Sequence, residues 1–281
     1  MSKTLPLVTL GVPVRNGASM LRAALDSIVA QDYPNLEIVV SDNGSTDETP
    51  DILRDYGQRY PNIRVIRHEQ PLTAIDNFLL LMREAKGEFF AWCAHDDTRS
   101  PDFVSGLVQA FDDPKTVLAF GDLYVWDGVS PPQPRPDYDF ANDDLPRWRR
   151  IRKTAHMQCY HFYGLWRAGW LQSIPYTYTH WWSDLPIMLA SAAVGRFRYV
   201  PGPKFFYYEV VKTASERAAY QDNLARPSRM KNFAALFSAV SLTVTRAVGP
   251  FAAVSSIAFI VEKYVYESGR RLKSILTGGA R

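Results

Sequence analysis

Cysteine is scarce in this chain of 281 residues, which holds only Cys93 and Cys159. Two cysteines do not make a disulfide framework, and Cys93 falls in a stretch that we expect to be a buried strand. The composition therefore favours a reducing, cytoplasmic setting. The first residues, Met1–Pro6, lack the long apolar core of a signal peptide, which agrees with this expectation.

Strong charge of either sign is also missing. The 32 lysines and arginines nearly balance the 29 aspartates and glutamates, and a net charge of +3 is too small to indicate nucleic acid as a partner. Hydrophobic residues make up 47% of the chain and charged residues 22%, so the chain can build a sizeable core and is not expected to be disordered.

Long apolar runs are absent from the C-terminal part as well. Its two uncharged stretches, 232–245 and 247–261, are each shorter than the ~18 apolar residues of a membrane-spanning helix. Gly249-Pro250 should separate them into two helices, and basic residues flank the pair. The helices could pack on the rest of the chain or on a second copy, as in a homodimer. They could also lie at the inner face of the plasma membrane, with their basic ends on anionic lipid.

Apolar strands and amphipathic helices alternate through the first 111 residues. The predicted order is strand 7–14, helix 21–29, strand 36–40, helix 50–60, strand 63–66, helix 74–84, strand 89–94 and helix 101–111. This alternation predicts an α/β fold with a mostly parallel sheet and helices on both faces. Further strands are predicted at 117–120, 123–126, 199–200 and 205–208, and a further helix at 185–194.

Two of the predicted parallel strands end in acidic residues. Asp42 follows the strand at 36–40, and His95-Asp96-Asp97 follows the strand at 89–94. The carboxyl ends of parallel strands meet at one edge of the sheet, where ligands bind in open α/β folds. Adjacent carboxylates repel each other unless a cation lies between them, so this pair predicts a site for a hard divalent ion that also holds phosphates. The alternative is a pair of solvated loop aspartates.

The second half of the chain is dense in aromatic residues. They gather at 160–170 and again just before Asp184, where Trp181 and Trp182 stand. Aromatic residues mostly form cores, but beside polar groups they can also hold a sugar ring. A basic run at 147–153 is either a solvated helix face or a cationic wall for a phosphorylated substrate.

Three sequence blocks together resemble the signature of family 2 glycosyltransferases. The blocks are Val12-Pro13-Val14-Arg15-Asn16, the loop Ser41–Thr49, and His95-Asp96-Asp97 followed by Pro101-Asp102-Phe103. Their order and spacing carry the resemblance, which covers about residues 7–215. It implies a domain of the GT-A fold at 1–226, with a nucleotide-binding half at 7–125, an acceptor half at 126–226, and a helical extension at 227–281.

This resemblance implies an inverting glycosyltransferase. It would move a sugar from a nucleotide-diphosphate donor, preferably a UDP-sugar, to a hydroxyl of a glycan or lipid-linked acceptor, in bacterial cell-envelope polysaccharide biosynthesis. The implied nucleotide-sugar contacts are Pro13, Val14, Arg15, Asn16, Asp42, Asn43 and Asp96. Asp96 and Asp97 match the motif that holds Mg²⁺ or Mn²⁺ against the donor diphosphate. Asp184 matches the general base, and a carboxylate at a helix N-terminus is favoured in the charged form that a base requires.

The chain departs from the family pattern at two places. Many members have an aspartate two positions before the acidic pair, where this chain has Ala94. The acidic cluster is therefore reduced, and His95 is expected to be a hydrogen-bonding neighbour of the metal site or an acceptor contact. Members also often have a histidine after the last strand. Here Lys212 could offer positive charge to the diphosphate instead, which would weaken the dependence on metal.

Two other functions are open at this point. A nucleotide-sugar-binding or glycan-binding module without turnover would be expected to lose Asp184 or the acidic pair, and this chain keeps both. A nucleotidyltransferase would need a glycine-rich, basic phosphate loop after the first strand, whereas residues 12–17 supply one arginine and one glycine.

Overall fold

The computed structural model describes residues 4–135, 140–176, 184–209 and 229–276, with the backbone alone described for Cys159, 229–233 and 264–276. Contacts within the chain divide it into two compact units. The first comprises 1–143, 160–173 and 196–224, and the second comprises 144–159, 174–195 and 225–281. The domain boundary at residue 226 that the sequence suggests stays a prediction.

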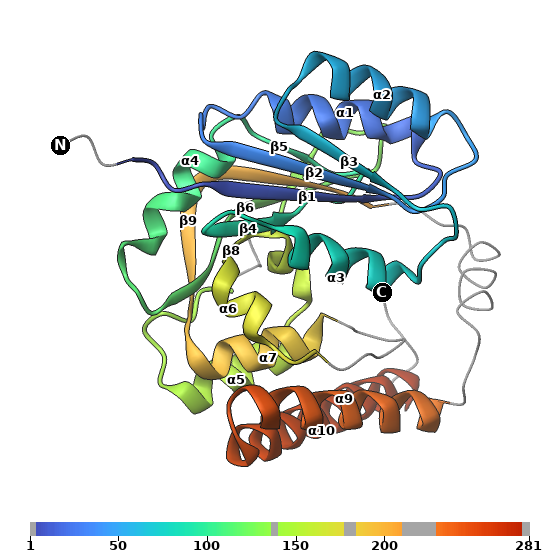
Figure 1. The fold of residues 1–281 in the computed structure, drawn as a ribbon. Helices are drawn as coiled ribbons and strands as arrows, with labels where there is room; N and C mark the ends of the chain where they lie inside the picture. Colours follow the sequence, from blue (N-terminus) through green and yellow to red (C-terminus); the bar gives the residue numbers. More distant parts are fainter. Residues whose placement is uncertain (1–3, 136–139, 177–183, 210–228, 277–281) are drawn as a thin grey trace. The chain divides into compact units, whose positions relative to one another are not determined.

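The first unit is built on one mixed β-sheet (Figure 1). From edge to edge its strands are β3 (Ile63–Arg67), β2 (Leu36–Asp42), β1 (Val8–Val14), β4 (Phe89–Trp92), β8 (Leu165–Arg167), β6 (Thr116–Trp126), β9 (Arg196–Tyr208) and β5 (Thr98–Arg99), and β7 (Gln133–Pro134) pairs with β6. The pairings among β3, β2, β1 and β4 and between β6 and β9 are parallel, whereas β8 and β5 pair antiparallel with their neighbours. The prediction of a mostly parallel sheet is confirmed.

Helices cover both faces of the parallel strands, as predicted. The helices of this unit are α1 (Ala18–Val29), α2 (Thr49–Arg59), α3 (Ala74–Glu84), α4 (Phe103–Val108) and α6 (Ala168–Ser173), with the 3₁₀ turns η1 (Gln109–Asp112) and η2 (Cys159–Tyr163). Figure 1 shows α1 and α2 on one face of β1, β2 and β3 and α3 on the other. Apolar residues at helical spacing explain the packing, since Leu21, Leu25 and Ile28 of α1 are all buried.

The strand that carries the acidic pair is anchored deep in the core. Every residue of β1 and of β4 is buried, as expected for central strands covered on both faces. Trp92 stacks on Phe162 with the ring centroids 4.3 Å apart, and its Nε1 donates to the Phe78 carbonyl oxygen at 2.9 Å. The end of β4, and with it the start of the acidic loop, is therefore held rigidly.

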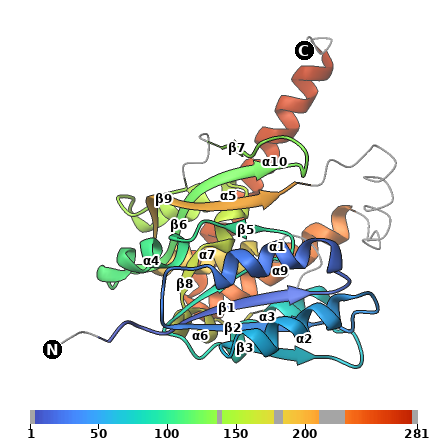
Figure 2. The same cartoon turned by 90° about the horizontal axis from the view of Figure 1, so that it is seen from above.

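Two pairs of short predicted strands are in fact two long ones. The strands predicted at 117–120 and 123–126 form the single strand β6, and those at 199–200 and 205–208 belong to β9. Figure 2 shows these two strands side by side. Their parallel register shifts between Phe120 and Asp122, where a Cβ on Gly121 would lie 2.0 Å from the Pro203 carbonyl oxygen. Gly121 therefore marks a β-bulge and not the end of a strand, because β9 lies too close to this position for a side chain.

The second unit is helical. It contains α5 (Arg147–His156), α7 (Leu185–Val194), α9 (Arg229–Ala247) and α10 (Pro250–Leu276), in which α10 packs on α9 and α5, and α7 packs on α5 and α9. α7 is buried from Leu185 to Ala193, which its apolar sequence explains. Gly249, with φ at +119°, ends α9, so the predicted break between two C-terminal helices is confirmed. In the described part of the chain, no helix is both long and apolar enough to cross a membrane.

Candidate functional site

The loops after β1 and β4 meet at one edge of the sheet in the first unit. Val14 is in register with Asp42, and Gly11 is in register with Trp92, so the three parallel strands end close together. A Cβ on Gly17 would lie 2.4 Å from His95 Cδ2, so the His95 ring packs where only a glycine fits. The structure therefore brings the Arg15–Asn16 loop and the acidic loop together.

The loop after β2 fastens the start of α1. Three backbone N–H groups donate to side chains of this loop: Asn16 to Ser45 Oγ (2.9 Å), Gly17 to Thr49 Oγ1 (3.0 Å) and Ala18 to Asp47 Oδ2 (3.1 Å). Asn16 has φ at +52°, a left-handed conformation that asparagine tolerates, and its Oδ1 accepts from the Thr46 N–H at 2.8 Å. The two loops are thus preorganised. Arg15 is exposed at this edge, whereas Pro13 and Val14 are buried in β1.

Asp42 is buried and paired with an arginine that sequence reasoning missed. Its side chain is 1% exposed, and its Oδ2 accepts from Arg67 Nη1 at 2.9 Å while its Oδ1 accepts from the Ser45 N–H at 2.9 Å. Arg67 is in register with Asp42 at the end of β3 and remains half exposed. Both carboxylate oxygens are therefore engaged, and the cationic group that faces outward here is Arg67.

Asn43 holds a neighbouring loop rather than presenting its amide. Its Nδ2 donates to the Leu72 carbonyl oxygen at 3.0 Å, and its Oδ1 accepts from the Leu72 N–H at 2.7 Å. The side chain is 4% exposed. It thereby fixes the segment that leads into α3.

Asp97 is a buried carboxylate at this edge that has only one of its two oxygens hydrogen-bonded. Its side chain is 1% exposed, its Oδ1 accepts from the Tyr208 N–H at 2.9 Å, and its Oδ2 is buried without a hydrogen-bond partner. Burial, with the nearby negative charge of Asp96, raises the pKa of Asp97 to about 7. A buried carboxylate oxygen without a partner favours a positive group beside it.

Arg99 supplies a buried positive charge near Asp97. It is 3% exposed, its Nη2 donates to the Trp92 carbonyl oxygen at 2.8 Å, and its guanidinium lies over the rings of Phe103 and Phe205. Its charge opposes the rise in the pKa of Asp97 without cancelling it. Sequence reasoning missed Arg99, and its position two residues after the acidic pair is the signal that could have found it.

Asp96 and Asp97 could hold a divalent cation. In the part of the chain that the structure describes, no three His, Cys, Asp or Glu side chains gather as a ligand set. The orphaned Oδ2 of Asp97 nevertheless fits a hard cation, because Mg²⁺ and Mn²⁺ prefer carboxylate oxygens and take further ligands from water and phosphates. Asp96 and His95 are partly exposed beside it.

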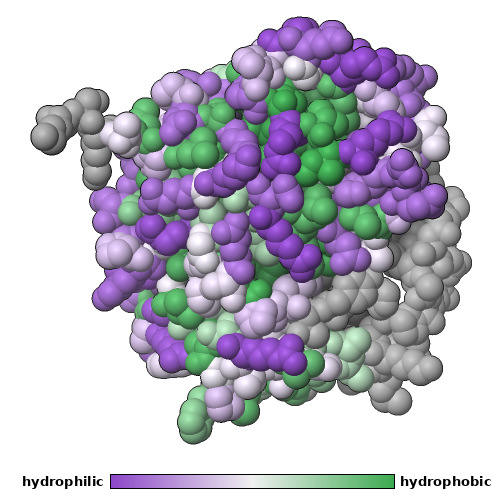
Figure 3. All heavy atoms as spheres, viewed as in Figure 1, coloured by the Kyte–Doolittle hydropathy of each residue, from purple (hydrophilic) through white to green (hydrophobic). Residues whose placement is uncertain are grey.

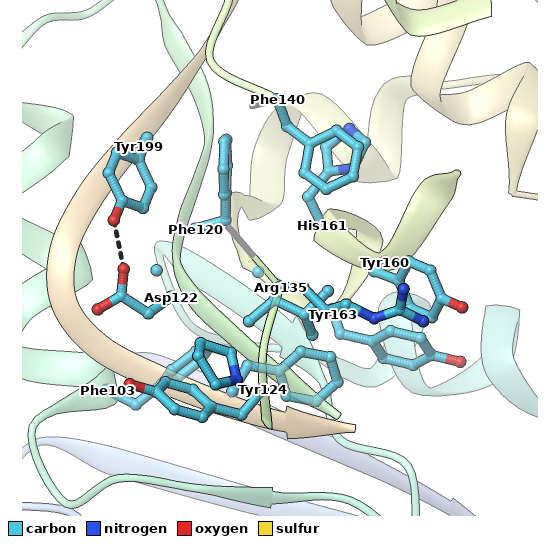
Figure 4. Close-up of a pocket in the computed structure, with 15 residues that line it drawn as sticks. Phe103, Phe120, Asp122, Tyr124, Arg135, Phe140, Tyr160, His161, Tyr163 and Tyr199 are labelled. Carbon is cyan, nitrogen blue, oxygen red and sulfur yellow. Dashed lines mark hydrogen bonds between the residues drawn. The ribbon is translucent and has the colours of Figure 1, made fainter. Parts of the chain in front are cut away.

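An aromatic cavity of about 420 Å³ lies next to this edge (Figure 4). Its ring-bearing lining residues are Phe103, Phe120, Tyr124, Phe140, Tyr160, His161, Tyr163, Tyr199 and Phe205. Asp122 and Arg135 add charge, and Figure 4 shows the Tyr199 hydroxyl donating to the Asp122 carboxylate. Tyr160 connects the cavity to the edge, since its ring lies 4.8 Å from that of Tyr207. Apolar ring faces beside polar groups suit a sugar ring.

The remaining predicted site residues belong to other parts of the chain. Asp184 stands at the N-terminus of α7 in the second unit, half-buried, and its side chain makes no N-cap hydrogen bond. Trp181, Trp182 and Lys212 lie outside the described residues.

Comparison with known proteins gives one clear family match. The model described as "Glycosyl transferase family 2" matches residues 9–169. A protein of Rickettsia felis described as an uncharacterized glycosyltransferase is 36% identical over 120 residues, which are 41% of this chain. That alignment covers only 19% of the Rickettsia protein, so the chain matches a small part of this relative.

Solved structures share the architecture at low sequence identity. TarS of S. aureus in complex with UDP-GlcNAc has a TM-score of 0.66 at 16% identity, over 92% of this chain and 72% of TarS residues 1–349. The mannosyltransferase PcManGT of Pyrobaculum calidifontis, in complex with GDP-Man and Mn²⁺, has a TM-score of 0.56 at 18% identity, over 96% of this chain and 81% of that one. The predicted GT-A fold is confirmed.

Proposed function

The chain belongs to glycosyltransferase family 2, and we propose that it is an inverting enzyme that transfers a sugar from a nucleotide-diphosphate donor to an acceptor hydroxyl. A UDP-sugar is the favoured donor, because the TarS structure, which matches this chain with a TM-score of 0.66, contains UDP-GlcNAc. The observation that carries the proposal is the buried Asp97 with an unpartnered Oδ2 beside Asp96, at the edge where three parallel strands end.

The diphosphate would bind at the acidic pair. Asp97 and Asp96 would hold Mg²⁺ or Mn²⁺, which when bound neutralises the negative charge that develops on the departing diphosphate. The PcManGT complex with Mn²⁺ supports the use of a divalent ion in this fold. The buried charge of Arg99 keeps Asp97 closer to its ionised form, and the Tyr208 N–H orients its carboxylate.

The nucleoside would bind at the ends of β1 and β2. Asp42 holds Arg67 in place, so the Arg67 guanidinium is the group that we expect to meet the base or ribose, with Arg15 exposed nearby. Asn16 and Asn43 act on the shape of the pocket, since their amides fix the surrounding loops. Pro13 and Val14 line it from β1.

Asp184 would serve as the general base. The acceptor oxygen forms a bond to the anomeric carbon on the face opposite the diphosphate, and the bond from that carbon to the diphosphate oxygen breaks. The proton of the acceptor hydroxyl passes to the Asp184 carboxylate, and the nucleoside diphosphate departs with the bonding electron pair. The N-terminus of α7 favours the charged carboxylate that this role requires.

The acceptor would be a glycan or a lipid-linked glycan. The aromatic cavity beside Tyr160 and Tyr207 is the place where we expect one of its sugar rings to pack. His95, Trp181, Trp182 and Lys212 remain proposed contacts for the acceptor or the diphosphate.

A panel of nucleotide sugars tests this function by thermal shift, with and without Mn²⁺. We expect one UDP-sugar to raise the melting temperature in the presence of Mn²⁺, and Asp97→Asn to abolish that shift. Asp32→Asn is the matched control, because this aspartate is exposed between the end of α1 and the start of β2, at the opposite edge of the sheet. Stabilisation by a nucleotide sugar without any release of nucleoside diphosphate on adding glycan acceptors would favour the binding module without turnover.

A further inference from the structure

The exposed face of α10 is apolar, although a surface helix normally turns polar residues to water. Within 250–263, where its side chains are described, the exposed residues are Pro250, Phe251, Val254, Ala258 and Val261. Phe251 is 88% exposed and Val254 is 67% exposed. At about 100° per residue, residues 251, 254, 258 and 261 fall within an arc of about 80°. We call these four residues the α10 stripe.

The side of α10 that packs in the second unit is the one opposite the α10 stripe. The opposite side of the helix is already buried, with Ala252, Ala253 and Ile260 at 4% exposure or less, and α10 packs on α5 and α9. Figure 3 shows apolar residues at the surface over the turn between α9 and α10. Single exposed apolar residues are ordinary, but an aligned row of them indicates an interaction surface.

The surroundings of the stripe are basic. Arg246 is exposed in the last turn of α9, and no ion pair is described for it. Between Arg229 and Lys263 the sequence has one acidic residue, Glu262, and its carboxylate accepts from Arg152 Nε at 3.0 Å. The one negative charge of the stretch 229–263 is therefore paired with a cation.

The helix that pairs with Glu262 adds an aromatic residue. Trp148 of α5 is 51% exposed, and Arg149 Cζ lies 5.0 Å from its ring centroid. Trp148 precedes Arg152 by one helical turn, so it lies on the side of α5 that reaches α10 through the Arg152–Glu262 pair. Tryptophan and arginine side chains together are typical of surfaces at the level of lipid headgroups.

We propose that the α10 stripe docks the chain onto an anionic phospholipid surface. Phe251 and Val254 would enter the boundary between headgroups and acyl chains, and Arg246 would lie on the phosphates. The charges favour a membrane over a second copy, because a symmetric pairing of this face would bring basic rims together. An anionic lipid surface is complementary to both the apolar row and its rim. The proposal goes beyond glycosyl transfer and does not depend on it.

Co-sedimentation with vesicles tests the proposal. The full chain is mixed with vesicles of phosphatidylcholine and phosphatidylglycerol, and with vesicles of phosphatidylcholine alone. We expect binding to the anionic vesicles that weakens with salt, and a loss of about tenfold or more in Phe251→Ser combined with Val254→Ser. Arg246→Glu should weaken binding to the anionic vesicles by about fivefold and leave weak binding to neutral vesicles unchanged.

Val129→Ser is the matched control. Val129 is 91% exposed in the first unit, so its replacement removes an equally exposed apolar side chain elsewhere, and it should leave binding unchanged. Thermal unfolding checks that every variant is folded. Absence of wild-type binding to anionic vesicles overturns the proposal, and so does equal binding by the double variant. A wild-type dimer that the double variant converts to a monomer, without vesicle binding, would assign the stripe to a second copy instead.

Discussion

Replacing Asp97 by asparagine should stabilise the metal-free protein while destroying its donor site. The ordinary pKa of 3.8 applies to Asp97 in the unfolded chain, and burial raises it to about 7 in the folded protein. Between these values the folded state binds one proton more than the unfolded state. The stability that Asp97 contributes is therefore fully present below about pH 4 and is lost as the pH rises through about 7.

The size of the effect follows from the shift in pKa. The pKa shift is about three units, and each unit corresponds to about 1.4 kcal/mol. Above pH 7 the ionised Asp97 therefore lowers the free energy of unfolding by roughly 4 kcal/mol. Asparagine is neutral at every pH and avoids this cost. Its amide nitrogen would take the place of the unpartnered Oδ2 and lose hydrogen bonds to water, at about 1–3 kcal/mol. We therefore expect Asp97→Asn to be more stable than wild type by about 1–3 kcal/mol at pH 8.

Urea unfolding in chelator, at intervals from about pH 5 to about pH 8, measures this difference. Subtracting the free energies of unfolding of the two proteins removes the contribution of the other titrating groups. The advantage of Asp97→Asn should increase as the pH rises toward 7, by up to about 1.4 kcal/mol per pH unit. A difference that does not vary with pH would refute the burial argument. In wild type the proton should also compete with the cation, so Mn²⁺ affinity should fall by up to about tenfold per pH unit below 7, as measured by calorimetry.

Three further changes test other parts of the structure. Arg67→Ala leaves the buried Asp42 carboxylate without its cation, so we expect a loss of about 1–3 kcal/mol in urea unfolding and weaker nucleotide binding, both partly restored by Arg67→Lys. Gly121→Ala drives a methyl group into the backbone of β9 and should cost about 3 kcal/mol, whereas Gly57→Ala, with no atom near its Cβ, should be neutral or stabilising; equal melting temperatures would contradict the bulge. Asp184→Asn should keep donor affinity by thermal shift while turnover falls by about 10²–10⁴-fold, and near-normal turnover would remove Asp184 from the base role.

The local elements of the fold could be predicted because their signals are local. The helix predicted at 74–84 is α3 with the same bounds, since apolar spacing and the cap at Thr73 lie within one stretch of chain. The strand predicted at 89–94 is β4, which begins at the predicted residue and ends two residues earlier, at Trp92. The long strands β6 and β9 were each divided in two, because glycine and proline mark a turn and a bulge alike. Only the approach of the partner strand distinguishes these two.

The site shows the same division. The location of the site could be predicted from the sequence, because parallel strands place their carboxyl ends at one edge of the sheet. Asp42 is the last residue of β2, and the acidic pair follows β4. The pairing of Asp42 with Arg67 depends on the register of β2 and β3, which no local pattern encodes. Asn43 was predicted as a donor contact, but both ends of its amide are used by Leu72.

The sequence by itself determined the α/β alternation, the family and the edge of the sheet that carries the acidic residues, because periodicity and motif spacing are properties of neighbouring residues. Only the tertiary structure decided which carboxylate lacks a partner. Asp97 and Asp96 are adjacent in sequence, yet Asp97 is buried against Tyr208 and Asp96 is partly exposed. Burial and partner choice arise from segments more than a hundred residues apart, and these set the pKa and the metal chemistry of the pair.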